Sequence, residues 1–294
     1  MRLQLRRRPS LVLVLAAVLA TALALLTAAC GSDDSKDAPA ASPDTAGTTA
    51  PTPTPAKVTL QGDITVFAAA SLTDAFKELG KAFEAANPGT HVTFNFGASS
   101  ALATQIDQGQ PGDVFASADS ANMKKVADKN LAGPPVIFAT NIPVVVVPAS
   151  GSPVKAFEDL VKPGVKLVLA APAVPIGNYS RTIFTNASAA SGGISADFSE
   201  KALANLKSNE ADVRAVLAKV QTGEADAGIV YATDAAVAGA QVKTVPIPEK
   251  YNVIARYPIA TLTESGHAEV AAGFIAFVLS DAGQAILQKY GFGH

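Results

Sequence analysis

Residues 64–86 read ITVFAAASLTDAFKELGKAFEAA. The β-branched and aromatic residues at 64–67 predict a short strand, and apolar residues then recur at helical spacing. One helix face collects Leu72, Ala75, Phe76, Leu79 and Phe83. Three alanines and Ser71 join the two segments, so this stretch predicts a strand that leads almost directly into an amphipathic helix.

The same alternation continues along the chain. Further strands are predicted at residues 91–96, 113–118, 144–147, 166–170, 227–231 and 242–246. Further helices are predicted at residues 101–108, 121–129, 178–187, 199–206, 212–221 and 268–290, the last with a break near 281–283. Strands that alternate with helices are typical of an open, mainly parallel α/β sheet.

The folded part of the chain is expected to form two lobes. The 237 residues from 58 to 294 are too many for one small core and fit two lobes of common size. We expect the chain to cross between lobes near residues 140–144 and 252–259. The predicted limits are 58–141 plus 254–294 for lobe one and 142–253 for lobe two. A cleft between two such lobes is a natural ligand site.

The N-terminus has the order of a secretory signal peptide, predicted at residues 1–29. A basic start with four arginines precedes an uncharged, apolar stretch at 11–26, which small residues follow up to Cys30. The apolar stretch is shorter than the about 20 residues that a membrane span needs. The alternative is a retained N-terminal anchor helix.

Cys30 is the only cysteine, so no intrachain disulfide can form. Its position resembles a lipoprotein box, although Thr27 stands where leucine is usual. We therefore expect cleavage before Cys30 and a lipid anchor on the extracytoplasmic face of the cell membrane. Residues 30–57 contain no aromatic residue and cannot bury enough surface to fold, so they predict a tether. The alternative is an extension without a role.

The net charge argues against a nucleic-acid partner. Of 23 basic residues, four arginines belong to the signal segment, which leaves 19 against 25 acidic residues, a net charge of -6. The remaining chain contains no basic block, which nucleic-acid binding requires.

Ser71 admits two interpretations. Residues 71–74, Ser-Leu-Thr-Asp, match a capping box, so Ser71 is expected to cap the helix that follows. The same position, at a helix start after three small residues, also suits an anion, because helix N-termini present free N–H groups and a partial positive charge.

A second turn repeats this pattern at residues 97–102, GASSAL. Two such turns in successive strand–helix units lie side by side at the carboxyl edge of one sheet, where ligands of open α/β sheets bind. Lobe two offers a loop that turns into a helix at residues 174–179, a helix start at Asp212-Val213, and Tyr231 at a strand end. Spacing alone also allows Tyr231 to be a half-buried strand aromatic.

Five segments together resemble a known family, the periplasmic molybdate-binding proteins of molybdate importers. They are VFAAASLT at 66–73, GQPGDVFASAD at 109–119, VP.G.Y at 174–179, GIVY with Asp234 at 228–234, and KYGF at 289–292. The resemblance covers residues 58–293. It implies a type II periplasmic-binding-protein fold, in which two lobes, each a mainly parallel sheet flanked by helices, enclose the ligand.

The resemblance also implies the ligand and its donors. A molybdate or tungstate oxyanion is expected to be held by the hydroxyls of Ser71, Ser99 and Tyr231 and by the backbone N–H groups of Ile176 and Val213. Asp234 is expected to support them from behind. The family more often has alanine where Ile176 stands, and a bulkier side chain there can reshape the loop. No further cofactor is implied; the protein partner is the membrane permease of an ABC importer, and the chain itself is expected to be a monomer.

Other functions stay open. A serine hydrolase needs a base beside its nucleophile, but the chain has only His91, His267 and His294 and none of the G-x-S-x-G, S-x-x-K or H-E-x-x-H motifs. We therefore do not expect an enzyme. A binding protein for sulfate, phosphate, ferric iron or an organic anion is a second alternative, and an adhesin or structural lipoprotein is a third.

Overall fold

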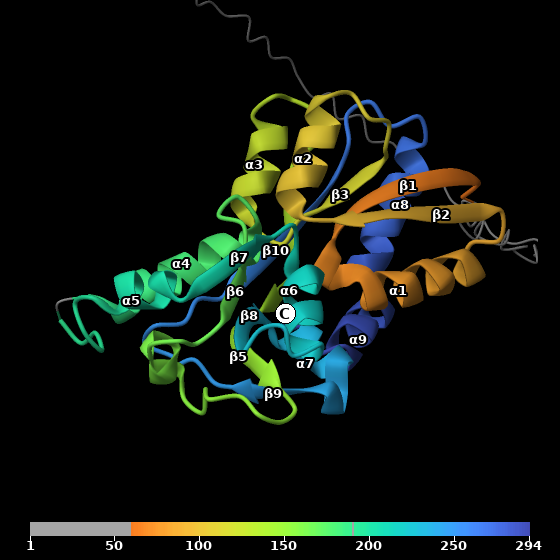
Figure 1. Cartoon of the computed structure of the whole chain (residues 1–294). Coiled ribbons are helices and arrows are strands. Elements are labelled where there is room, and N and C mark those ends of the chain that lie inside the picture. The colour runs from red at the N-terminus through yellow and green to blue at the C-terminus, as the bar shows by residue number, and fades with distance from the viewer. Residues whose placement is uncertain (1–59, 190) are drawn as a thin grey trace, which may run out of the picture. The chain divides into compact units, whose positions relative to one another are not determined.

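The computed structural model describes residues 60–189 and 191–294, which form two five-stranded sheets flanked by helices (Figure 1). The strand orders are β2-β1-β3-β10-β4 and β7-β6-β8-β5-β9. In each sheet four strands run one way and one runs against them, β10 in the first and β5 in the second. The predicted two-lobe, mainly parallel α/β fold is confirmed. The predicted signal peptide, Cys30 and the tether lie outside the described residues.

The first sheet is covered on both faces. Its strands are β1 (Gly62–Ala69), β2 (Thr90–Gly97), β3 (Val114–Ala116), β4 (Val136–Asn141) and β10 (Ala255–Thr261). Its helices are α1 (Thr73–Ala86), α2 (Ser99–Asp107), α3 (Ser120–Ala127), α8 (Ala268–Leu279) and α9 (Asp281–Lys289), with a 3-10 turn η1 (Ala70–Leu72) before α1. Side chains alternate along β1: Val66 and Ala68 join the cluster that contains Phe76 of α1, whereas Phe67 joins the cluster under α2 and α3.

The second sheet carries two pairs of helices. Its strands are β5 (Pro143–Pro148), β6 (Leu167–Ala170), β7 (Leu206–Glu210), β8 (Ala227–Tyr231) and β9 (Val242–Val245). Its helices are α4 (Pro175–Ala187), α5 (Phe198–Ala204), α6 (Val213–Gln221) and α7 (Ala232–Ala238), with 3-10 turns η2 (Phe157–Val161) and η3 (Gly239–Gln241). A Cβ at Gly228 of β8 would lie 2.8 Å from Val216 Cγ1, so glycine allows α6 to sit directly on this strand.

Two short connections join the sheets. Only Ile142 separates β4 from β5, and residues 246–254 lead from β9 to β10. The connections are neighbours, because Asn252 Nδ2 donates a hydrogen bond of 3.0 Å to Pro143 O and Ala255 pairs with Asn141. Both sheets belong to one compact unit, Ala56–His294.

Several elements differ from the sequence predictions. The strands β4, β7 and β10 and the helix α7 were not predicted. The predicted helix at 199–206 ends at Ala204, because Leu206 already pairs with Leu167 in the sheet. The predicted break in the last helix lies at Ser280, whose side chain caps α9 by accepting a bond from Gly283 N.

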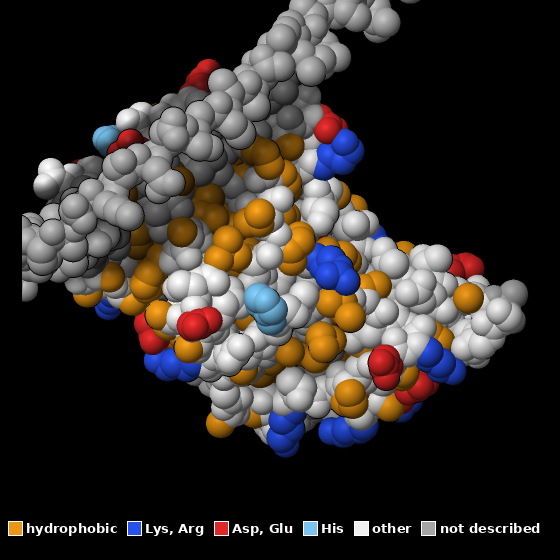
Figure 2. All heavy atoms as spheres, turned by 180° about the vertical axis from the view of Figure 1, so that it is seen from behind, with side chains coloured by type: hydrophobic (Ala, Val, Ile, Leu, Met, Phe, Trp, Pro, Cys, Tyr) orange, Lys and Arg blue, Asp and Glu red, His pale blue; other side chains and the backbone are white. Residues whose placement is uncertain are grey.

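Two further features of the described residues are the distribution of charge on one face and the length and apolarity of the helices. On the face in Figure 2, Lys and Arg side chains lie scattered among acidic and uncharged ones. In the described part of the chain no single helix has the length and apolarity of a membrane span. The helices α8 and α9 together have the required length and apolarity, but they are bent by 62° relative to each other.

Candidate functional site

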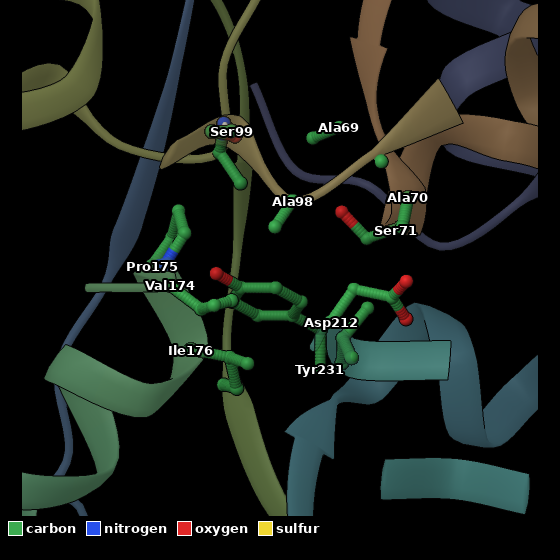
Figure 3. A pocket seen from close by; sticks show the side chains of 13 residues that line it. Ala69, Ala70, Ser71, Ala98, Ser99, Val174, Pro175, Ile176, Asp212 and Tyr231 are labelled. Atoms are coloured by element: carbon green, nitrogen blue, oxygen red, sulfur yellow. Dashed lines mark hydrogen bonds between the residues drawn. The ribbon is translucent and has the colours of Figure 1, made fainter. Parts of the chain in front are cut away.

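The predicted site residues meet at one pocket between the two sheets. The centre of a water-sized sphere has a volume of only about 10 Å³ to move in within this pocket. That is far below the roughly 300–1,000 Å³ of pockets for drug-sized ligands, so the site as it stands suits only a small ligand. Its lining consists of Ala69, Ala70, Ser71, Gly97, Ala98, Ser99, Ala118, Val174, Pro175, Ile176, Asp212, Val213 and Tyr231. Figure 3 shows Ser71 and Ser99 on one side and Pro175, Ile176 and Tyr231 on the other.

Helix starts surround this pocket. Ser99 is the first residue of α2, Val213 is the first of α6, and Ile176 is the second of α4 after Pro175. N–H groups in the first turn of a helix have no partner within the helix, and the helix dipole gives that end a partial positive charge. No Lys, Arg or His appears among the described lining residues, so the donors that the lining offers an anion are neutral groups.

A close approach of two backbones positions the start of α4. A Cβ at Gly177 would lie 2.1 Å from Ala171 O and 2.5 Å from Ala170 O. Only glycine therefore permits the first turn of α4 to lie against the end of β6. This contact fixes the position of the first turn of α4, which contains Ile176.

Asp212 is the one acidic residue in the lining, and its carboxylate caps the N-terminus of α6. Its Oδ1 accepts hydrogen bonds from Arg214 N at 2.8 Å and Ala215 N at 3.0 Å. The cap therefore occupies the second and third N–H groups of α6. The first N–H, that of Val213, is left for another acceptor.

The hydroxyl of Ser99 accepts one hydrogen bond and donates none to a described residue. The side chain is 1% exposed, and its Oγ accepts a hydrogen bond of 2.9 Å from Ala118 N. A backbone N–H can only donate, so the serine oxygen is an acceptor in this contact. The hydroxyl proton of Ser99 is available to donate into the pocket.

Ser71 does not cap a helix, and this prediction is wrong. The chain turns into a 3-10 helix at Ala70, so Ser71 lies inside that turn rather than before α1, and neither Ala69 nor Leu72 makes a side-chain cap. Instead, Ser71 Oγ lies 3.0 Å from Tyr257 Oη in β10. The hydroxyl is therefore held at the pocket wall by β10, which is separated from β1 by β3 in the sheet.

Tyr231 carries the least satisfied polar group of the site. The side chain is 1% exposed, and its hydroxyl has no hydrogen-bond partner among the described residues. Burial raises the pKa of Tyr231 well above its ordinary value, so the phenol keeps its proton. A buried hydroxyl without a partner costs about 1–3 kcal/mol. Such a group points to a ligand that the site is built to receive.

Asp234 lies behind Tyr231 and not in the lining. Its Oδ2 accepts a bond of 3.3 Å from Tyr231 N, and its Oδ1 lies 2.7 Å from Arg214 Nε as an ion pair. Burial raises the pKa of Asp234 from its ordinary value of 3.8 to about 6, although the Arg214 charge opposes this shift. The carboxylate ties the start of α7 to α6.

Four residues around the site were not predicted as functional: Asp74, Asn141, Arg214 and Tyr257. Asp74 and Arg214 follow the predicted ligands Ser71 and Val213 within three positions, so sequence proximity was the available signal. Tyr257 contacts Ser71 across 186 residues of chain. No local pattern marks such a pair.

Side chains suited to a catalytic base or a metal ion are not gathered here. None of the three histidines, all of which lie in the described residues, lines the pocket. His91 is exposed on β2, where it lies 3.0 Å from Glu84. Within residues 60–189 and 191–294, no group of three His, Cys, Asp or Glu side chains is placed to hold a metal ion.

Comparison with known proteins gives the class of this two-lobed binding fold. The profile described as bacterial extracellular solute-binding protein matches residues 64–293, and the chain belongs to this family. It is 43% identical over 251 residues to the Mycobacterium tuberculosis protein named molybdate-binding protein ModA, covering 84% of this chain and 90% of that one. The alternatives of an adhesin or a structural lipoprotein are not favoured.

Two further comparisons are informative. A Bacillus subtilis protein provisionally named ABC transporter substrate-binding lipoprotein YvgL is 34% identical over 244 residues, covering 80% of this chain and 86% of that one. The solved structure of the sulfate-binding protein SubI from M. tuberculosis has a TM-score of 0.70 at 20% identity, covering 79% of this chain and 86% of that one. The second likeness shows the fold alone.

Proposed function

We propose that this chain is an extracytoplasmic solute-binding protein that captures molybdate, and tungstate with it, and delivers the ion to an ABC importer. The 43% identity to a protein named for molybdate binding supports the choice of ligand. The single structural observation that carries the proposal is the buried Tyr231 hydroxyl, which has no partner among the described residues and lines the pocket.

The polarity of the pocket supports an anion. Ser99 can donate its proton to the pocket, because its oxygen is the acceptor in the bond from Ala118 N and the hydroxyl donates to no described residue. Tyr231 has a free and protonated hydroxyl. The first N–H of α6 at Val213 and the second of α4 at Ile176 add backbone donors. We propose these groups and the hydroxyl of Ser71 as the ligands of the ion.

Neutral donors are sufficient for a doubly charged ion. Hydrogen bonds to a charged group contribute about 1.5–3 kcal/mol each. Five of them can support a submicromolar dissociation constant, which corresponds to roughly -8 to -12 kcal/mol, after the costs of ordering. A set of donors also rejects protonated oxyanions, because their own O–H would face donors only. Sulfate carries no proton, so the dimensions of the closed cleft must discriminate against it.

The remaining features follow from the same proposal. Cleavage before Cys30 gives a lipid-anchored protein whose tether ends near residue 57, and the provisional name of the B. subtilis relative supports this anchor. Lobe one then comprises residues 58–141 plus 254–294, and lobe two comprises 142–253. The chain acts as a monomer that presents the loaded cleft to a membrane permease. It needs no cofactor beyond the ion that it carries.

We also infer that the chain is not an enzyme. Ser71 and Ser99 have as neighbours a phenol and a backbone N–H, neither of which can take a proton from a nucleophilic serine at neutral pH. Loss of an esterase activity on Ser71→Ala would contradict this inference.

Calorimetric titration of the full chain, purified in detergent, tests the proposal. Molybdate and tungstate should bind with submicromolar dissociation constants, and sulfate and phosphate should bind at least a hundredfold more weakly. Equal or tighter binding of sulfate would assign the site to another anion. Absence of binding for all four ions would remove the proposed function.

A further inference from the structure

Asn141 is a buried amide at the end of β4, immediately before the chain enters the second sheet. Its Oδ1 accepts a hydrogen bond of 2.9 Å from Ile142 N. A backbone N–H can only donate, so this contact fixes which end of the amide is oxygen. The Nδ2 group consequently faces Thr233 Oγ1 at 2.8 Å and Tyr257 Oη at 3.4 Å, and it can only donate to both.

The hydroxyl of Tyr257 connects Asn141 to the pocket through hydrogen bonds. Its side chain is fully buried in β10, and the recorded partners of its hydroxyl are Asn141 Nδ2 and Ser71 Oγ. Burial raises the pKa of Tyr257, and the nearby Tyr231 hydroxyl opposes this shift, but the contact between the two hydroxyls does not have the geometry of a hydrogen bond. Since Asn141 Nδ2 cannot accept, Ser71 Oγ at 3.0 Å is the hydrogen-bonded acceptor for the phenol proton of Tyr257. The proton of Ser71 is then free to point into the pocket. Ser71 then resembles Ser99: each serine oxygen accepts a hydrogen bond from the protein, and each hydroxyl proton can be donated to the pocket.

We propose that Tyr257 and Asn141 are positioning residues that hold Ser71 as a hydrogen-bond donor toward the bound anion. The inference rests on the proposed function and deepens it. The order of donation runs from Asn141 to Tyr257, from Tyr257 to Ser71, and from Ser71 to the ion. The chain of bonds starts at the crossing between the sheets, where Asn141 also donates to Thr233 of α7.

A purely structural role is the competing explanation for Tyr257. Its ring packs against Phe138, Tyr231 and Phe292, with centroid distances of 6.2, 5.8 and 5.6 Å. Phenylalanine at this position keeps these ring contacts and removes only the hydroxyl. The two roles therefore separate in Tyr257→Phe, because a packing role survives the change and a donor role does not.

A double-mutant cycle tests the inference. Molybdate affinity is measured by calorimetry for the wild-type full chain, Tyr257→Phe, Ser71→Ala and the double variant, and thermal unfolding without ligand checks that each is folded. We expect Tyr257→Phe to weaken binding about fivefold in the wild type. In the Ser71→Ala chain it should change nothing, because the group that Tyr257 orients is absent.

Tyr251→Phe is the matched control. Tyr251 is also a buried tyrosine, and its hydroxyl donates to Gly192 O at 2.9 Å, away from the pocket lining. This variant should bind molybdate as the wild type does. If Tyr257→Phe does not fold, Asn141→Asp provides the same cycle: an acceptor at position 141 draws the Tyr257 proton away from Ser71. The new carboxylate also repels the anion directly, so a part of its loss should remain in the Ser71→Ala chain. The loss should be smaller there than in the wild type, because the orientation of Ser71 no longer contributes.

The outcomes are distinguishable. Unchanged affinity of Tyr257→Phe, or an equal loss with and without Ser71, overturns the inference while the proposed function stands. A wild-type chain that does not bind molybdate overturns the proposed function and the inference together. A loss confined to chains that contain Ser71 supports both.

Discussion

Arg214 Nη2 lies 2.7 Å from Asp74 Oδ2, and this ion pair joins α6 of the second lobe to α1 of the first. The same guanidinium lies 2.7 Å from Asp234 Oδ1 within the second lobe. We expect opening of the cleft to break the contact with Asp74, which joins the two lobes, and to keep the contact with Asp234, which lies within one lobe. Arg214 directly follows the proposed ligand Val213, so we expect closure of the lobes to be coupled to formation of the anion site.

Asp74→Asn should weaken molybdate binding about two- to fivefold, because the closed form loses a partly exposed ion pair and the open form loses nothing. The effect should shrink at high salt, which screens the wild-type pair. Calorimetry at low and high ionic strength measures it. Asp197→Asn, which removes an ion pair with Lys201 inside the second lobe, is the control and should not change affinity. Equal losses for both variants would contradict the assignment to closure.

Ser99→Ala should reduce molybdate affinity by about 1.5–3 kcal/mol, since it removes one donor to a charged ligand. Ser71→Ala should do the same. Ser100→Ala is a matched control, because Ser100 is the next residue on α2 and lies outside the pocket lining. Titration of all three variants is decisive: unchanged binding in both Ser71→Ala and Ser99→Ala would remove the proposed site.

Tyr231→Phe should have opposite effects on the free and the loaded protein. Without ligand the change removes a buried hydroxyl that has no partner among the described residues, so stability should stay the same or rise by about 1 kcal/mol. With molybdate the variant loses a donor, so the affinity should fall. Urea unfolding and calorimetry on the same samples measure the two effects. A drop in the stability of the free protein would mean that the hydroxyl has a partner inside the protein.

Gly177→Ala should weaken binding more strongly than its size suggests. The added Cβ would lie 2.1 Å from Ala171 O, so the start of α4 must shift and carry the N–H of Ile176 with it. We expect a loss of affinity of about tenfold or more, as for one donor to a charged ligand. Ser188→Ala, at the other end of the same helix, is the control. Wild-type affinity in Gly177→Ala would show that α4 supplies no ligand.

Asp234 predicts how stability depends on pH. Its pKa is about 6 in the folded chain against an ordinary value of 3.8, so the folded state binds more protons between these values. Stability from this group is therefore complete below about pH 4 and is lost as the pH rises through about 6, by about 1.4 kcal/mol for each unit of the shift. Urea unfolding across this range measures the slope, and Asp234→Asn should flatten it. An unchanged slope in the variant would assign it to other groups.

Local patterns carried much of the fold. The helix α1 was predicted because Phe76, Leu79 and Phe83 recur at helical spacing and are all buried in the structure. The strand β10 was missed because Pro258 interrupts it, at the point where its pairing with β4 shifts register. The strand β7 was missed because its sequence, LKSNE, is polar. It lies at the edge of the sheet, where its residues are at most half-buried and need not alternate between apolar and polar.

In the candidate site, too, the sequence indicated some residues, whereas other contacts are visible only in the structure. Ser71 and Ser99 follow from a turn pattern that repeats within one lobe. In lobe two the sequence pointed to the loop at 174–179, the helix start at Asp212-Val213 and Tyr231, and the family resemblance then implied which groups are ligands. Their meeting at one pocket depends on two sheets folding together. The contacts that orient these residues could not be predicted from the sequence, because Ser71 and Tyr257 are 186 residues apart. Only the folded chain brings such pairs together.

The central claim is that neutral hydroxyl and N–H groups at helix starts hold a metal oxyanion between the lobes. A crystal of the chain grown with molybdate tests it most directly, because anomalous scattering locates the molybdenum atom independently of the protein. We predict one anomalous peak, surrounded by Ser71, Ser99, Tyr231 and the first turns of α4 and α6. A peak elsewhere, or a cleft that stays empty under saturating molybdate, would contradict the account.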